Sequence, residues 1–261
     1  LYFKNKSGII SHSPIFMNGT REKPIVISGD STSQGIHILQ AHKKSVLKWT
    51  TFSGLNTLNY KGWTLTGAVT FYESDVRIEH CVFEHNKCED ALNIIRSNFK
   101  FLESLIQHTF ADGLDGDFCI GEIKNSTFKN TNNDCIDFSG STILIINCNI
   151  NNAGDKAISG GEKSRITIKN IKVNNANIGV ASKDLSEIDI KSSSFKNINI
   201  VYAAYQKKAE YGPATIKSYL SKYTNYKKRQ LIDLGSEIYV GKNKSTGRKK
   251  INIELLYQDF K

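Results

Sequence analysis

Acidic and amide residues recur through the middle of this chain at a nearly constant spacing. They are Asp90, Asp112, Asp134, Asp155, Asn177 and Asn199, and successive members lie 22, 22, 21, 22 and 22 residues apart. Asp115 and Asp137 are also 22 residues apart, and Asp117 follows Asp115 by two. Carboxylates act as general acids, as general bases and as cation ligands. A repeating unit that places them at equivalent positions would gather them along one strip.

Residues one repeat apart would lie about 4.8 Å from each other, where two ionised carboxylates repel strongly if water is excluded. A shared proton, a bound cation or a basic neighbour must relieve that repulsion. The candidate catalytic residues are Asp115, Asp117, Asp137 and Lys156. Calcium is the candidate cofactor, with Asp115 and Asp137 as its ligands. The candidate substrate-binding residues are Arg96, Glu162, Lys183, Asp184, Lys207 and Lys208.

A purely structural interpretation competes with the catalytic one. Asp before Gly or Ala at a turn is common because its side chain caps backbone amides, and a ladder of ion pairs can serve stability alone. Asp115, Asp117 and Asp137 crowd two successive turns, which turn capping does not require. For these three residues the two interpretations are evenly balanced.

The apolar residues between the acidic positions indicate the elements that must hold them. They alternate at period two, as in Val76, Ile78, Cys81 and Phe83, and the pattern returns in the following repeats. Such alternation predicts strands with one buried face, and a repeat in the low twenties predicts a solenoid. We therefore predict an all-β, right-handed parallel β-helix with coils of roughly 22 residues. The leucine-rich repeat is the rival solenoid, but the inward positions here are Ile, Val and Phe.

In this pattern the chain resembles the right-handed parallel β-helix superfamily, which includes pectate lyases, polygalacturonases, alginate and chondroitin lyases and phage tailspikes. The resemblance covers residues 65–206 and extends back to "PIVISGD". It implies that an extended sugar chain binds along the strip. Family motifs do not assign the chain to one enzyme family. The segment "NTNND" matches the polygalacturonase Asn-Thr-Asp motif only imperfectly, and the Asp-Asp and Gly-His-Gly motifs of that family are missing. The Asp-Pro-His-Glu motif of alginate epimerases is missing as well. The spacing of Arg96, Lys156, Lys183 and Lys207 neither confirms nor excludes a lyase that uses a basic residue.

One structural domain is expected, with irregular N-terminal coils and a cap at 1–64, regular coils at 65–206, and basic C-terminal coils and a cap at 207–261. A column of amides at Asn130, Asn152, Asn175 and Asn197 predicts a ladder at a strand-ending turn. The five cysteines lack metal-binding spacing, and we expect most to be buried thiols. Residues 214–226 fit either a strand and turn or a short helix.

The net charge of +10 is concentrated in residues 207–261, which hold thirteen Lys or Arg against five Asp or Glu. This basic end has two interpretations. It could bind a polyanion, or it could be a solvated cap whose charge discourages the stacking of solenoid ends. Nucleic acid is disfavoured because no recognition motif accompanies the charge. No apolar run is long enough for a transmembrane segment, and the first residues lack the regions of a signal peptide. We expect the chain to begin inside a longer precursor.

The leading functional hypothesis is an extracellular, periplasmic or cell-surface protein that binds an extended acidic polysaccharide along the Asp/Lys-rich strip. The sequence leaves open whether it also cleaves this polysaccharide, as a lyase or as a glycoside hydrolase. The alternative is a non-catalytic module of a larger surface protein: a glycan-recognition domain, an adhesin or a structural solenoid. A calcium-stabilised solenoid is a third hypothesis. No sequence feature indicates the oligomeric state. A trimer like that of the tailspikes has no marker in this sequence.

Overall fold

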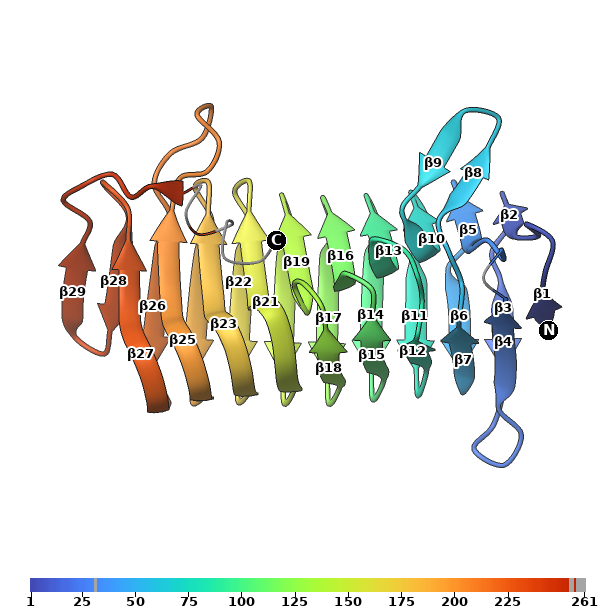
Figure 1. The fold of residues 1–261 in the computed structure, drawn as a ribbon, viewed down its shortest axis with the longest axis horizontal. Coiled ribbons are helices and arrows are strands. Elements are labelled where there is room, and N and C mark those ends of the chain that lie inside the picture. Colours follow the sequence, from blue (N-terminus) through green and yellow to red (C-terminus); the bar gives the residue numbers. More distant parts are fainter. Residues whose placement is uncertain (31, 254–255, 257–261) are drawn as a thin grey trace.

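The computed structural model describes residues 1–30, 32–253 and 256, and these residues form a parallel β-helix (Figure 1). One coil contains three short strands, β14 (Asn98–Leu102), β15 (Leu105–Thr109) and β16 (Asp112–Asp117). Each strand pairs in parallel with its counterpart in the next coil, so that Asn98 lies opposite Ile120 and Asp90 opposite Asp112. The predicted fold class and coil length are confirmed. No helix within the described ranges is long and apolar enough to cross a membrane.

The strands of the described chain form two large sheets and one hairpin. The 11-stranded sheet, called sheet B, consists of β3 (Phe16–Asn18), β6 (Ser45–Lys48), β11 (Val76–Glu79), β14, β17 (Ile120–Lys124), β20 (Thr142–Ile146), β22 (Arg165–Lys169), β24 (Glu187–Lys191), β26 (Thr215–Tyr219), β28 (Glu237–Val240) and β29 (Asn243–Thr246). The 16-stranded sheet, called sheet A, has a first row of β1 (Tyr2–Phe3), β4 (Ile25–Gly29), β7 (Thr50–Ser53), β12 (Val82–Glu84), β15 and β18 (Thr127–Thr131). Its second row is β2 (Ile9–Ser11), β5 (Ile36–Leu39), β10 (Gly67–Tyr72), β13 (Asp90–Ile95), β16 and β19 (Ile136–Ser139).

Four long strands join the two rows of sheet A in the later coils. They are β21 (Asn149–Gly161), β23 (Lys172–Lys183), β25 (Ser194–Tyr205) and β27 (Lys222–Ile232). Residues 214–226, for which the sequence left two alternatives open, contain all of β26 and the start of β27, so the strand-and-turn alternative holds. The pairing of β21 with β23 shifts register between Ala153 and Lys156, where the strand passes from one row to the other.

The interior is a continuous column of apolar side chains, because the alternating residues of all three strand rows point inward. Phe101, Ile145 and Ile168 are fully buried, as the repeat predicts. All five cysteines are free and buried, which confirms their interpretation as core thiols. Gly121 takes an inward position in register with Phe99, and the Phe99 ring fills the space that a side chain would need.

Asparagine residues with left-handed backbone conformations lie at the corners of the coils, and their side chains form hydrogen-bonded ladders from coil to coil. Asn152 donates a hydrogen bond to Asn130 at 2.8 Å, and Asn175 donates to Asn152 at 3.0 Å. All three have φ between 56° and 63°, the left-handed conformation that Asn tolerates. The predicted column is confirmed up to Asn197, which donates to Asn174 rather than to Asn175. A second ladder, which the sequence analysis missed, links Asn125, Asn147 and Asn170.

Two insertions interrupt the regular coils and extend beyond the same edge of the solenoid (Figure 1). The first contains the antiparallel hairpin of β8 (Leu58–Tyr60) and β9 (Trp63–Leu65). The second is the loop between β25 and β26. The coils that contain β13, β16 and β19 lie between the two insertions along the long axis.

Candidate functional site

The carboxylates predicted to stack do so on the outer face of the second row of sheet A. Asn93, Asp115 and Asp137 are register partners on β13, β16 and β19, and Ser159 of β21 continues the line. We call these four residues the carboxylate row. Leu114 and Ile136 alternate with it and are fully buried in the core. The alternation of the strands therefore presents the carboxylates outward on a rigid sheet.

Asp115 sits in an environment that disfavours its ionised form. The amide of Asn93 donates to Asp115 Oδ2 at 2.8 Å and to Asp90 Oδ2 at 3.1 Å, so one side chain joins both carboxyl groups. Burial raises the pKa of Asp115 well above its ordinary value, and the nearby charges of Asp90 and Asp137 raise it further. Burial and the neighbouring charges therefore favour the protonated form of this carboxyl.

Asp137, one strand further on, is affected in the opposite direction. Burial alone would raise its pKa, but the charges of Lys183 and Lys156 outweigh burial, and the pKa lies below its ordinary value. Lys183 Nζ lies 3.4 Å from both carboxylate oxygens of Asp137. The Asp137 side chain is 22% exposed. The environment of Asp137 therefore favours its ionised form, whereas that of Asp115 favours the protonated form.

Asp117 lies two residues beyond Asp115 on β16, opposite Ser139. Burial raises its pKa, and the charges of Glu162 and Asp137 add to this effect. Glu162 itself forms an ion pair with Lys208. The three aspartates singled out by the sequence are therefore brought together.

Lys156 lies in a buried cluster rather than on the open surface. Its side chain is 4% exposed and pairs with Asp134, at 3.3 Å, and with Asp155. Asp134 Oδ1 also accepts the Lys156 backbone N–H at 2.9 Å, and Asp112 Oδ1 accepts that of Asp134 at 2.8 Å. These aspartates cap the amides of the following coil, which is the structural role that the alternative interpretation assigned to them.

The predicted binding residues fall on two sides of the carboxylate row. Arg96 follows β13, forms an ion pair with Glu73 at 3.6 Å and donates to the Tyr72 hydroxyl at 3.1 Å. On the other side, Asp184 is buried and its Oδ1 accepts the backbone N–H groups of Lys207 and Lys208, at 2.6 and 2.8 Å. Asp184 thus orders the start of the second insertion. Lys183, Glu162 and Lys208 are the members of this group that carry charge next to the three aspartates.

Asn93 and Ser159 are site residues that the sequence analysis did not name. Each lies 22 residues from an aspartate of the row, Asn93 before Asp115 and Ser159 after Asp137, so the period itself was the signal. Ser159 lies beside Asp137 in the strand register, and its hydroxyl is buried. Extending the column one repeat in each direction would have found both residues.

Calcium binding at Asp115 and Asp137 stays a prediction. No group of three or more His, Cys, Asp or Glu side chains within the described ranges is arranged to hold a metal ion. Calcium takes six to eight oxygen ligands, whereas the Lys183 ammonium lies against both oxygens of Asp137. The ammonium of Lys183 itself offsets the negative charge of Asp137.

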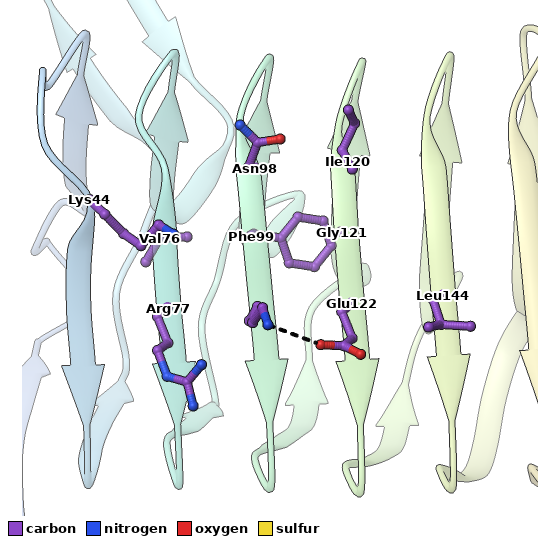
Figure 2. Close-up of a pocket in the computed structure, with 10 residues that line it drawn as sticks. Lys44, Val76, Arg77, Asn98, Phe99, Ile120, Gly121, Glu122 and Leu144 are labelled. Atoms are coloured by element: carbon purple, nitrogen blue, oxygen red, sulfur yellow. Dashed lines mark ion pairs between the residues drawn. The ribbon is translucent and has the colours of Figure 1, made fainter.

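A hollow of about 430 Å³ lies on the outer face of sheet B, away from the carboxylate row (Figure 2). Ile120 and Leu144 line it on one side and Arg77 lines it on the other. The ion pair drawn in it joins Lys100 to Glu122 at 3.5 Å. No two carboxylates with opposed pKa shifts line this hollow, so it is not the candidate site.

No protein-family model and no curated protein matches this chain. Solved structures do match it. The catalytic domain of a GH87 alpha-1,3-glucanase variant in complex with tetrasaccharides has a TM-score of 0.52 and 11% identity over 90% of this chain and 60% of that one. The alginate lyase from Paenibacillus sp. str. FPU-7 has a TM-score of 0.46 and 11% identity over 88% and 89% of the two chains. PfbA, a surface adhesin of Streptococcus pneumoniae, has a TM-score of 0.42 and 10% identity over 86% and 84%.

The chain spans about three fifths of the glucanase domain that it matches. At such low identity these likenesses concern the fold alone. The match with the glucanase domain supports the solenoid fold of this chain and nothing beyond the fold.

Proposed function

We propose that this protein hydrolyses an extended polysaccharide at the carboxylate row, with Asp115 as general acid and Asp137 as general base. The observation that carries the proposal is the opposed shift of two register partners, because the pKa of Asp115 is raised and that of Asp137 is lowered. Neighbouring carboxyl groups whose environments push their pKa values apart are suited to donate a proton and to accept one. Asp117 lies next to both and would orient the sugar or the attacking water.

Hydrolysis is favoured over elimination by the positions of the basic residues. Lys156 is buried between two carboxylates, and Lys183 lies against Asp137. Because carboxylates engage both amines, neither lysine is free to abstract a proton next to a uronate. Arg96 and Lys208 flank the row and would bind acidic groups of a substrate.

The substrate is proposed to be extended and, as the flanking cations suggest, acidic. The outer face of β13, β16, β19 and β21 is an elongated surface on which several sugars of one chain could lie. The carboxylate row itself would repel a polyanion, whereas Arg96 and Lys208 would attract it. Comparing acidic with neutral polysaccharides measures which effect prevails. An extracellular or cell-surface location follows from such a substrate.

A non-catalytic glycan-binding module is the second candidate, and the contacts within the row favour it. Asp115 accepts a hydrogen bond from Asn93, and Asp137 is paired with Lys183. Carboxylates that are hydrogen-bonded and paired within the protein can serve stability and recognition without chemistry.

The test incubates the protein with acidic and neutral polysaccharides, with calcium or with EDTA, and records reducing ends and the ultraviolet absorbance of unsaturated ends. We expect reducing ends without absorbance, and a loss of about 10²–10⁴-fold in turnover for Asp115→Asn and Asp137→Asn. Asp189→Asn, on the outer face of sheet B, is the matched control. Absorbance that rises with the reducing ends would contradict hydrolysis. Glycan binding without turnover, together with a lower melting temperature for Asp137→Asn, would establish the module instead.

A further inference from the structure

The β8–β9 hairpin presents an aromatic pair to solvent. Tyr60 and Trp63 are direct cross-strand partners, and they are 51% and 60% exposed. The turn between them consists of Lys61 and Gly62, with φ of 47° and 82°, as a tight type I′ turn requires. Leu58 is buried and anchors the hairpin. Two large aromatic side chains are therefore held on a rigid arm outside the core.

A hollow of about 250 Å³ lies between this aromatic pair and the first coils. Its lining is partly apolar, from Ile10 and Leu39, and partly polar, from His12 and Lys61. His12 also lines an adjacent hollow of about 510 Å³ that includes Gln40 and Glu73. An aromatic wall with a few polar groups beside it is the usual composition of a small-ligand site.

The strand register connects this hollow to the aspartates. Leu39, Tyr72, Ile95 and Asp117 are successive register partners on β5, β10, β13 and β16. Three strand spacings of about 4.8 Å separate Leu39 from Asp117, a distance of about 14 Å. The hollow and the carboxylate row therefore lie on one face, a few sugar lengths apart.

The surface between them continues the aromatic character. Arg96 donates to the hydroxyl of Tyr72, and its guanidinium lies 5.9 Å from the ring centre of Phe118. Phe118 is 54% exposed and directly follows Asp117. Half-buried Tyr72 and exposed Phe118, with Arg96 between them, form a track toward the site of the proposed chemistry.

We infer that Tyr60 and Trp63 form a sugar-binding subsite for the same polysaccharide, remote from the bond that is cleaved. The apolar face of a pyranose ring packs on an aromatic ring, while hydroxyl groups at its edge find donors and acceptors such as His12 and Lys61. The occupant is a sugar unit of a long chain, because a short oligosaccharide at Asp117 cannot span about 14 Å. This inference rests on the proposed function, since it assumes that a polysaccharide occupies the carboxylate row.

The test measures retardation of the protein in native gels containing each polysaccharide of the panel, using Asp137→Asn as the background so that no substrate is consumed. Adding Trp63→Ala or Tyr60→Ala should weaken binding of the polymer about tenfold. Binding of a disaccharide or trisaccharide, measured by calorimetry, should stay unchanged. Tyr219→Ala removes a comparably exposed aromatic residue, at the end of β26 in sheet B, and is the matched control. In an active background the same substitutions should raise KM for the polymer and leave kcat unchanged.

The outcomes separate this inference from the proposal beneath it. If a polysaccharide retards the parent protein and both hairpin variants equally, the hairpin is not a subsite, while the carboxylate row keeps its proposed role. If no polysaccharide retards the parent protein, both proposals fail. Equal weakening of short and long ligands would also overturn the inference, because it would indicate a disturbed carboxylate row.

Discussion

At the scale of single residues, the carboxyl groups make stability depend on pH. Burial and the charge of Asp134 raise the pKa of Asp112 to about 8, and burial raises the pKa values of Asp90 and Asp134 to about 6. A carboxyl whose pKa is higher in the folded protein than in the unfolded chain stabilises the fold while it is protonated. That contribution is complete below about pH 4 and is lost as the pH rises through the folded values.

We therefore expect these carboxyls to lower the free energy of unfolding between pH 4 and pH 8. Asp112→Asn, which removes the group that titrates last, should flatten the upper part of this dependence by at least about 1 kcal/mol. Urea denaturation across the pH range measures the effect, with Asp189→Asn as control. A slope unchanged by Asp112→Asn would show that this carboxyl is not held protonated.

The buried ion-pair cluster gives a second prediction at this scale. Lys156→Met removes the cation that balances Asp134 and Asp155 and should cost about 3–5 kcal/mol of stability, because buried carboxylates are left uncompensated. Lys48→Met removes one partner of an exposed pair with Glu79 and should cost less than about 1 kcal/mol. Equal costs in denaturation would contradict the structural role of Lys156. Turnover by a stable Lys156→Met protein would exclude Lys156 as the catalytic base.

At the scale of elements, a small residue at an inward strand position can be compensated by a large side chain on the adjacent strand of the neighbouring coil. A Cβ built on Gly121 would lie 2.0 Å from Cε1 of Phe99 on the adjacent strand. The glycine is therefore matched to the ring one coil before it. A repeat pattern shows that a position faces inward. It does not show how large the side chain there must be, because side chains from adjacent coils fill the same space together.

Gly121→Ala should destabilise the protein by about 1–3 kcal/mol, because the added methyl group overpacks the core. The double variant Gly121→Ala with Phe99→Leu should recover part of the loss, since the smaller side chain frees the space. Chemical denaturation of both single variants and the double variant gives the coupling energy. Strictly additive costs would mean that the two positions do not share one cavity.

At the scale of the whole molecule, the C-terminal end of the solenoid leaves an edge strand. Among the strands that the structure describes, β27 pairs in sheet A only with β25. Lys227, Lys228 and Arg229 on this strand are exposed. An unpaired edge with lysines is protected against pairing with another chain.

Replacing these three residues together with Thr should cause concentration-dependent self-association, because the edge loses its charge and gains β-propensity. Light scattering coupled to size-exclusion chromatography measures it. The control replaces Lys169, Lys172 and Lys191 with Thr, which removes the same charge from strands paired on both sides. Association of both variants to the same extent would attribute the effect to net charge rather than to the edge.

The sequence by itself determined the repeat, and with it the coil length, the inward residues, the asparagine column up to Asn175 and the stacking of Asp115 on Asp137. These follow from period alone, because a parallel solenoid places residues one period apart on adjacent strands. The sequence did not determine that Lys156 is buried or that Lys183 reaches Asp137 across two coils. Nor did it determine that the hollow beside the hairpin, at Leu39, lies about 14 Å from Asp117 on the same face. Those depend on where β21 bends, on the reach of side chains between coils and on the direction of an insertion. The spacing of residues along the sequence does not specify a bend, the reach of a side chain or the direction of an insertion. Only the tertiary structure decided these features.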